Sequence, residues 1–133
     1  MSDEAQAPSV WGTFQAHDAR AEIAFLVALG FEATVVYGEG DRVDHAQLDW
    51  PEGGGVMMGS HKPGGEWVTE PGTAGFYVVT ADPQAVHARA VAAGAQITRE
   101  VNSTDYGSTE FGLRDPEGNQ WSFGTYVGEP RKA

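Results

Sequence analysis

The chain of 133 residues contains one short segment twice. The tripeptide Pro-Glu-Gly occurs at positions 51–53 and again, 65 positions later, at 116–118. Each copy is followed at the same distance by a glycine, Gly59 in the first case and Gly124 in the second. A repeat of this length indicates that one supersecondary module occurs in tandem. A site in such a fold is expected on the pseudo-two-fold axis, where matched positions of the two halves meet.

A second pair of echoes precedes the tripeptides and predicts a helix in each half. Asp18 and Gly30 stand 12 residues apart, as do Asp82 and Gly94, and the residues between them are rich in alanine. Aspartate is a good N-terminal cap of a helix, and glycine commonly ends a helix in a left-handed conformation. Each half therefore contains one helix between its aspartate and its glycine.

Apolar periodicity and turn residues complete each half as a strand, a helix and three further strands. The sequence thus predicts an α+β fold of two tandem βαβββ modules, whose curved mixed sheets form a central cleft. The first module is expected over 9–60, a glycine- and proline-rich linker over 61–73, the second module over 74–126, and flexible tails over 1–8 and 127–133. The expected helices are Ala19–Leu29 and Pro83–Ala93, and the expected strands are Val10–His17, Ala33–Tyr37, His45–Asp49, Val56–Met58, Phe76–Thr80, Gln96–Val101, Thr109–Arg114 and Gln120–Phe123.

Composition excludes several classes of function. The absence of cysteine rules out disulfides, a thiolate nucleophile and cysteine-ligated metals. The formal net charge of −11 argues against nucleic acid and anionic membrane surfaces as partners, although it suits a cationic ligand as well as plain solubility. No apolar run reaches the roughly 18 residues of a membrane span, and residues 1–8 do not read as a signal peptide. We therefore expect a cytoplasmic protein.

Residues alternate between the two faces of a strand, so parity separates the face that packs on the helices from the open face. Trp121 and Phe123 are large and apolar and should cover a helix, which leaves Ser122 on the open face. The repeat gives Met57 the same place in the first module. Mixed aromatic and hydrogen-bonding side chains are typical of a small-molecule pocket. The residues expected to line the cleft are Trp11, Gln15, His17, His45, Gln47, Met57, Phe76, Glu110 and Ser122.

Two segments carry a resemblance to a known family. In 18–31, Asp-Ala-Arg-Ala leads through Phe25 and Leu26 to Leu-Gly-Phe, and 115–119 reads Asp-Pro-Glu-Gly-Asn. In order and spacing the chain resembles the vicinal-oxygen-chelate superfamily, which includes glyoxalase I, extradiol dioxygenases, fosfomycin-resistance enzymes and bleomycin-resistance binding proteins. The resemblance covers about residues 9 to 126. It implies the paired-module fold, whereas the chemistry has to come from the site residues, since one fold hosts many functions.

In the enzymes of that superfamily, a divalent metal is held by up to four His, Glu or Gln side chains, two from each module. By the resemblance, the first-strand positions of this chain are Trp11 and Phe76, which are also 65 residues apart. The fourth-strand positions are Ser122, seven residues after the aspartate of Asp-Pro-Glu-Gly, and Met57. None of these four is a usual ligand of a hard divalent ion, which prefers imidazole or carboxylate. We therefore expect no metal, no cofactor and no catalytic residue.

Several of these residues have two interpretations. Trp11 and Phe76 would stack on a bound ring at the centre of the cleft, or they belong to the core. His45 and Gln47 contact a ligand, or they hydrogen-bond to neighbouring strands. Trp67, in the linker, is a lid over the cleft or a plug in an interface.

A metal site of a different composition is also conceivable. Parity places His17, His45 and Glu110 on open faces, but nothing in their spacing supports a joint site. We expect a homodimer, because short modules leave edge strands and the linker exposes Trp67.

Three functions follow from these observations. The leading hypothesis is a metal-free protein of the bleomycin-resistance type, which sequesters an aromatic, preferably cationic small molecule and could confer antibiotic resistance. The alternative is a metal-dependent lyase or dioxygenase of the glyoxalase type, whose ligands lie elsewhere than the positions named above. The third is a subunit or regulatory module whose cleft is filled by a partner or by its own side chains.

Overall fold

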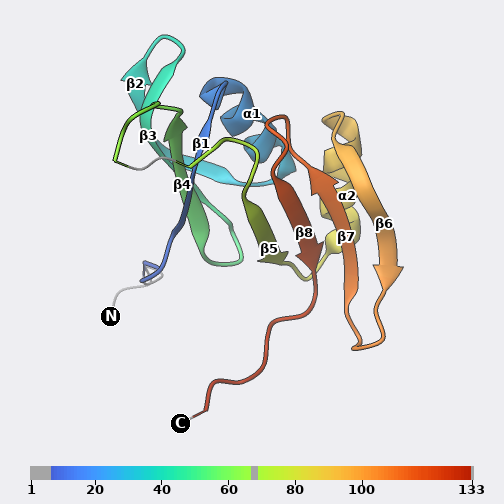
Figure 1. The fold of residues 1–133 in the computed structure, drawn as a ribbon. Coiled ribbons are helices and arrows are strands. Elements are labelled where there is room, and N and C mark those ends of the chain that lie inside the picture. The colour runs from blue at the N-terminus through green and yellow to red at the C-terminus, as the bar shows by residue number, and fades with distance from the viewer. Residues whose placement is uncertain (1–6, 67–68, 133) are drawn as a thin grey trace.

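The computed structural model describes residues 7–66 and 69–132, and within them the elements follow the predicted order (Figure 1). None of the described helices is long and apolar enough to cross a membrane. The elements are β1 (Gly12–Ala16), α1 (Ala19–Leu29), β2 (Glu32–Glu39), β3 (Arg42–Asp49), β4 (Gly55–Ser60), β5 (Gly75–Val79), α2 (Pro83–Ala92), β6 (Gln96–Ser103), β7 (Thr109–Arg114) and β8 (Gln120–Gly124).

The strands form two separate four-stranded sheets with the same topology. Sheet 1 has the order β1-β4-β3-β2 and sheet 2 the order β5-β8-β7-β6. In each sheet the first and fourth strands of the module run parallel, and the remaining neighbours are antiparallel. The α+β fold of two tandem βαβββ modules is confirmed. The sheets are open, because β1 and β5 each have a strand on one side only.

Both helices begin as the sequence predicts. The Asp18 carboxylate accepts a hydrogen bond from the amide of Ala21, and the Asp82 carboxylate accepts one from Ala85, each at 3.1 Å. These bonds satisfy an amide of the first turn that has no partner inside the helix. Helix α1 ends at Gly30, whose φ of +127° is a conformation that other residues rarely adopt.

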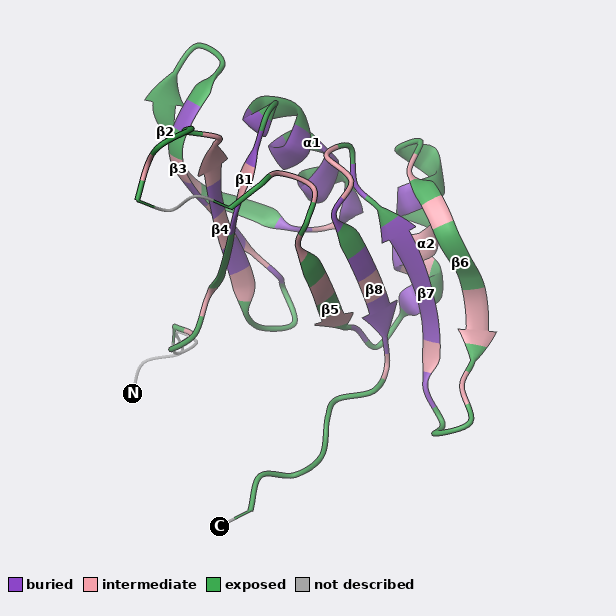
Figure 2. Ribbon diagram, viewed as in Figure 1, coloured by how far each residue is buried: buried purple, intermediate pink, exposed green. Residues whose placement is uncertain are grey.

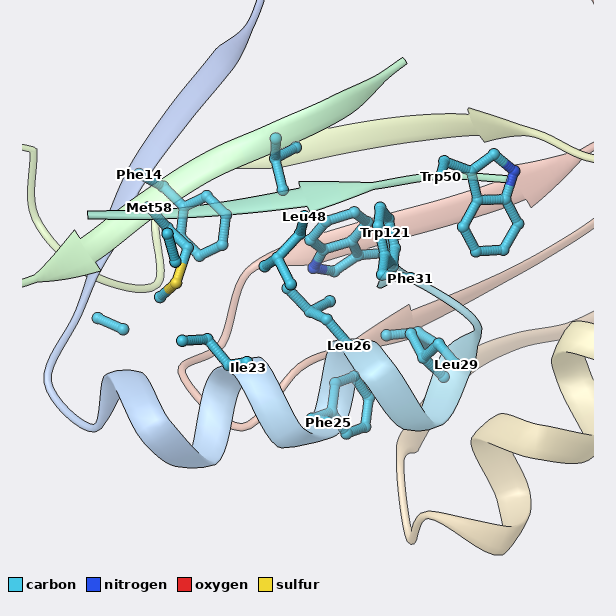
Figure 3. Close-up of a cluster of buried hydrophobic side chains, with 14 of the residues drawn as sticks. Phe14, Ile23, Phe25, Leu26, Leu29, Phe31, Leu48, Trp50, Met58 and Trp121 are labelled. Carbon is cyan, nitrogen blue, oxygen red and sulfur yellow. The ribbon is translucent and has the colours of Figure 1, made fainter. Parts of the chain in front are cut away.

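The helices cover one face of each sheet and join the modules in one hydrophobic core. Figure 2 shows the buried residues on α1, β4, β7 and β8, while β2 and β6 are largely exposed. In Figure 3, Leu26 and Leu29 of α1 point toward Phe31 and toward Trp121 from the second module. The rings of Phe31 and Trp121 lie 5.5 Å apart between centroids. Aromatic side chains from both halves therefore fill the space between the modules.

The repeated Pro-Glu-Gly turns tie each module to the helix of the other. The Glu117 carboxylate accepts hydrogen bonds from the amides of His17 at 2.7 Å and Asp18 at 3.0 Å, just before α1. In the same way the Glu52 carboxylate accepts one from the amide of Ala81 at 2.8 Å, just before α2. A glutamate within a helix can satisfy the N-cap amide in a capping box, and here the glutamate comes from the other module. The repeat is thus the structural joint of the fold.

A buried aspartate shapes the second of these turns. Oδ1 of Asp115 accepts from the amides of Glu117, Gly118 and Asn119, and its Oδ2 accepts from Asn119 Nδ2 and from Trp121 Nε1. Five bonds to one carboxylate hold the turn and orient Glu117 toward α1. The Asp-Pro-Glu-Gly-Asn segment therefore serves turn geometry and packing, as its composition indicates.

One carboxyl group of the core lacks a partner. Glu22, on α1, is fully buried, and neither of its carboxyl oxygens has a hydrogen bond among the described residues. Burial, followed by the neighbouring Asp115 and then by Glu117, raises the pKa of Glu22 to about 10. The folded protein therefore keeps a proton on Glu22 at neutral pH, whereas an unfolded chain releases it near pH 4.5.

This difference predicts that stability falls as the pH rises. The folded state binds one more proton than the unfolded state between the two pKa values, so the free energy of unfolding decreases by up to about 1.4 kcal/mol per pH unit from about pH 5 to pH 9. Glu22→Gln should abolish this slope, and Glu39→Gln, on an exposed strand, should retain it. Urea unfolding across the pH range measures both, and equal slopes for Glu22→Gln and the wild type would contradict the assignment.

Candidate functional site

The open face of sheet 1 carries the polar and flexible residues that parity predicts. In the register of the sheet, Thr13 of β1 lies beside Met57 of β4, and Met57 lies beside Gln47 of β3. Gln15 and His45 follow two residues along their strands and therefore share this face. The buried Phe14 and Met58 point to the opposite side, toward the helix.

A pocket of about 470 Å³ lies on this face and has the size of a small-molecule site. Apolar atoms come from Met57 and from Phe14 and Met58, and the linker after β4 closes one side. Polar groups surround this apolar part. The lining residues are Thr13, Phe14, Gln15, Asp44, His45, Met57, Met58, Gly59, Ser60, Lys62, Gly65, Glu66 and Thr69.

The polar side chains of this pocket are held by neighbours. Arg42 Nε donates to Asp44 at 2.9 Å, and Lys62 Nζ lies 3.8 Å from the same carboxylate. The hydrogen bond from Arg42 lowers the pKa of Asp44, so this carboxylate is charged at neutral pH. Oε1 of Gln15 lies 3.0 Å from Nδ1 of His61. The rim of the pocket therefore presents oriented charges and amide groups around the apolar floor.

The open face of sheet 2 has a different character, built around a buried glutamate. Glu110 accepts hydrogen bonds from the phenols of Tyr77 at 3.1 Å and Tyr106 at 2.9 Å, and Arg99 Nη2 lies 3.6 Å from its other oxygen. Gly124 makes room for this cluster, because a Cβ there would lie 2.6 Å from both Tyr77 Oη and Glu110 Cγ. A side chain at this position would push the cluster apart.

The hydrogen bonds keep Glu110 ionised despite its burial. Burial would raise the pKa of Glu110, but the hydroxyl groups of Tyr106, Ser108 and Tyr77 together outweigh it and lower the pKa. Burial and the nearby Glu110 in turn raise the pKa of Tyr77, so the phenol stays protonated. The rings of Tyr77, Tyr106 and Tyr126 remain exposed around this cluster. Sheet 2 thus presents an aromatic surface with fixed hydroxyl groups.

The structure corrects two of the predicted site residues. Phe76 was expected on the open face, but it pairs with Trp121 in the register, and the two rings stack at 4.2 Å on the core side. Trp11 precedes β1 and lies against Gly55, near the end of the sheet. Neither lines the pocket on sheet 1.

The physical reason is a difference of one residue between the repeats. The turns are 65 residues apart, but Asp18 and Asp82 are 64 apart, because the second module has one residue more between helix and turn. The first strands follow the helices, so Gly12 corresponds to Phe76, and Thr13 corresponds to Tyr77. The spacing of the two aspartates already contained the signal that identifies Thr13 and Tyr77.

The nine predicted cleft residues therefore do not share one pocket. Gln15, His45 and Met57 line the pocket on sheet 1. Gln47 lies on the same face but donates to the carboxylate of Asp49, and Glu110 and Ser122 lie on sheet 2. The predicted position of Trp67 lies outside the described residues. Sequence reasoning missed Asp44, Lys62 and Glu66, which line the pocket.

The residues at the centre of the two open faces do not fit a divalent metal. The matched positions carry Thr13, Met57, Tyr77 and Ser122, which offer hydroxyl groups and a thioether instead of imidazole or carboxylate. No cluster of three or more His, Asp or Glu residues suited to a metal occurs within 7–66 and 69–132.

The alternative metal site of His17, His45 and Glu110 is not formed. The ring of His17 lies 5.1 Å from that of His61, at the edge of sheet 1. Glu110 is held by the tyrosines of sheet 2.

This donor set predicts weak metal binding. Calorimetric titration of the purified protein with Zn²⁺, Ni²⁺ and Mn²⁺ should detect no binding at micromolar affinity. His17 and His61 form an exposed pair that could hold a metal loosely, so the variant with both replaced by alanine is the control. One equivalent bound at micromolar affinity or tighter, and retained in that control, would contradict the prediction.

Comparison with known proteins supports the architecture. The sequence matches the Glyoxalase/Bleomycin resistance protein/Dioxygenase superfamily over residues 12–123. TioX from Micromonospora sp. ML1 is similar in structure, with a TM-score of 0.73, 21% sequence identity, and coverage of 93% of this chain and 100% of TioX. A glyoxalase / bleomycin resistance protein from Catenulispora acidiphila DSM 44928 gives a TM-score of 0.64 at 22% identity, over 86% of this chain and 95% of its own.

A mutant of glyoxalase I from Zea mays gives a TM-score of 0.67 at 16% identity, over 89% of this chain and 45% of the maize protein. At these identities the likeness between structures concerns the fold alone. No curated protein matches the sequence.

Proposed function

The chain belongs to the Glyoxalase/Bleomycin resistance protein/Dioxygenase superfamily, and we propose that it is a metal-free binding protein that sequesters a small aromatic, preferably cationic molecule. The observation that carries the proposal is the pocket of about 470 Å³ on the open face of sheet 1. Its apolar floor around Met57 gives contact area, and a thioether adapts to rings of different shape. Gln15 and His45 supply hydrogen bonds that orient a ligand.

Charge favours a cation over an anion in this pocket. Asp44 and Glu66 both line it, and the chain as a whole carries a formal charge of −11. Lys62 and Arg42 balance Asp44, so the pocket itself is mixed and the long-range field of the protein supplies the preference. Ordinary salt screens this field beyond about 8–10 Å, so tight binding has to come from contacts inside the pocket.

The aromatic wall of the site is supplied by a second copy of the chain in this proposal. The pocket on sheet 1 is lined by residues 13–69 only, so it lacks a wall from the second module. The exposed rings of Tyr77, Tyr106 and Tyr126 stand on the open face of sheet 2. A two-fold symmetric dimer can place the sheet 1 face of one copy against the sheet 2 face of the other. The rings would then stack on a ligand held over Met57.

The metal-dependent alternative, a lyase or dioxygenase, has no observation in its favour. Its chemistry requires a polarising ion, and the central positions offer Thr13, Met57, Tyr77 and Ser122 instead. The antibiotic-resistance role follows from the binding proposal, because sequestration of a toxic aromatic molecule protects the cell that holds it.

A calorimetric titration tests the binding. The panel consists of antibiotics and planar heteroaromatic cations, together with neutral and anionic analogues. Met57→Lys places a charge on the pocket floor and should weaken the best ligand by about tenfold or more, since a buried unpaired charge is costly. Val27→Lys makes the same kind of change at an exposed position of α1 and should bind as the wild type. A panel without any binder, or equal affinity in Met57→Lys, would refute the proposal.

The same ligand shows whether the site spans two copies. Met57→Lys lacks the floor and Tyr106→Ala lacks part of the wall, so each variant alone should bind weakly. A mixed dimer of the two contains one intact floor facing one intact wall, and co-refolding should restore binding to part of the sites. No restoration, together with a mass near the monomeric 14.2 kDa in light scattering, would place the site within one chain.

A further inference from the structure

A second pocket lies between the two modules, away from the open face of sheet 1. It has a volume of about 370 Å³ and shares no residue with the pocket described above. One side is formed by the turn between β3 and β4, and the other by the edge strand β5. Its volume falls within the range of about 300–1,000 Å³ that is common for small-molecule sites.

The pocket exists because the two repeats differ at one matched position. Gly12 pairs with Val56 in sheet 1, as Phe76 pairs with Trp121 in sheet 2. The second module thus carries two large rings where the first carries glycine and valine. A Cβ on Gly12 would face only the ring of Phe76, at 3.4 Å. The missing side chain leaves the space that the pocket occupies.

Its floor is aromatic and held in place. Phe76 stacks on Trp121 at 4.2 Å, and Phe31 lies 4.8 Å from Trp50. The indole nitrogen of Trp50 donates to the carbonyl of Val79 at 3.1 Å, which fixes its ring against the edge of β5. Rings fixed in this way present faces and edges to a planar ligand without a large loss of side-chain entropy.

Its rim is open and carries one charge. Glu52 is the one charged residue among those that line the pocket. Its Oε2 accepts from the amide of Ala81, while its Oε1 has no hydrogen bond within the described residues. Gly53 and Gly54 beside it have no side chains and leave the rim accessible, and both adopt a positive φ. A carboxylate accepts several bonds, so a second donor can approach Glu52.

We propose that this pocket is a second binding site, for a single aromatic ring that carries an amidinium or ammonium group. The ring lies on the floor beside Phe76 and Trp50, and the cationic group pairs with the carboxylate of Glu52. The aromatic floor and the lone carboxylate select this chemistry over an aliphatic or an anionic ligand. The site is independent of the function proposed for the open face.

Benzamidine is a suitable probe, and nuclear magnetic resonance gives a local readout. Titration should shift the indole N–H signal of Trp50, which is identified by its loss in Trp50→Phe. Glu52→Gln keeps an acceptor for the amide of Ala81 but removes the charge, and it should weaken benzamidine by about tenfold. Glu117→Gln is the matched control, because it makes the same change in the repeated turn outside the pocket. Benzoate should not bind.

A second variant fills the pocket without disturbing the backbone. Gly12→Leu introduces a side chain into an extended strand, where it meets only the flexible ring of Phe76, so the protein should remain folded. Benzamidine binding should be lost in Gly12→Leu and unchanged in Met57→Lys. An unshifted Trp50 signal, equal affinity in Glu52→Gln, or binding lost in Met57→Lys instead would overturn this proposal. The first two outcomes leave the open-face proposal intact.

Discussion

The rest of the structure depends on the exchange of glutamates between the two modules. Glu117 of the second module binds the amides that lead into α1, and Glu52 of the first binds the amide that leads into α2. Each helix therefore begins correctly only when the other module is in place. The helices meet across the module boundary, and the aromatic residues between them close one common core. This arrangement explains why the Pro-Glu-Gly segment recurs: each copy performs the same task for its counterpart.

The joint also determines where a ligand can bind. Because the modules are held through their helices and core side chains, the largest open-face pocket receives residues from sheet 1 and the linker alone. Sheet 2 carries the phenols around Glu110, which are fixed by hydrogen bonds and await a partner surface in the dimer that we propose. The gap between the modules, where Gly12 faces Phe76, provides the second pocket. Functional surfaces thus arise where the two repeats have diverged in sequence.

Much of the fold could be predicted from the sequence. Asp18 and Asp82 cap the helices, Gly30 ends the first one, and Asp115 organises the turn, because each acts through local geometry. The site was harder to predict. A single extra residue in the second module reversed the face assigned to Phe76, since strand side chains alternate. The partners of Glu110 and Glu22 come from distant segments and the division into two pockets depends on tertiary packing, which no periodicity records.

The most direct test of this account is the unfolding of variants that break the joint. Glu117→Ala loses two hydrogen bonds and Glu52→Ala loses one, at about 0.5–1.5 kcal/mol for each bond. Urea unfolding should be monitored by circular dichroism and by the indole signals of Trp50 and Trp121, one from each module. We predict a single transition in both variants, coincident for all probes, with Glu117→Ala the less stable of the two. Separate transitions for the two modules, or stability equal to that of the wild type in both variants, would contradict the account.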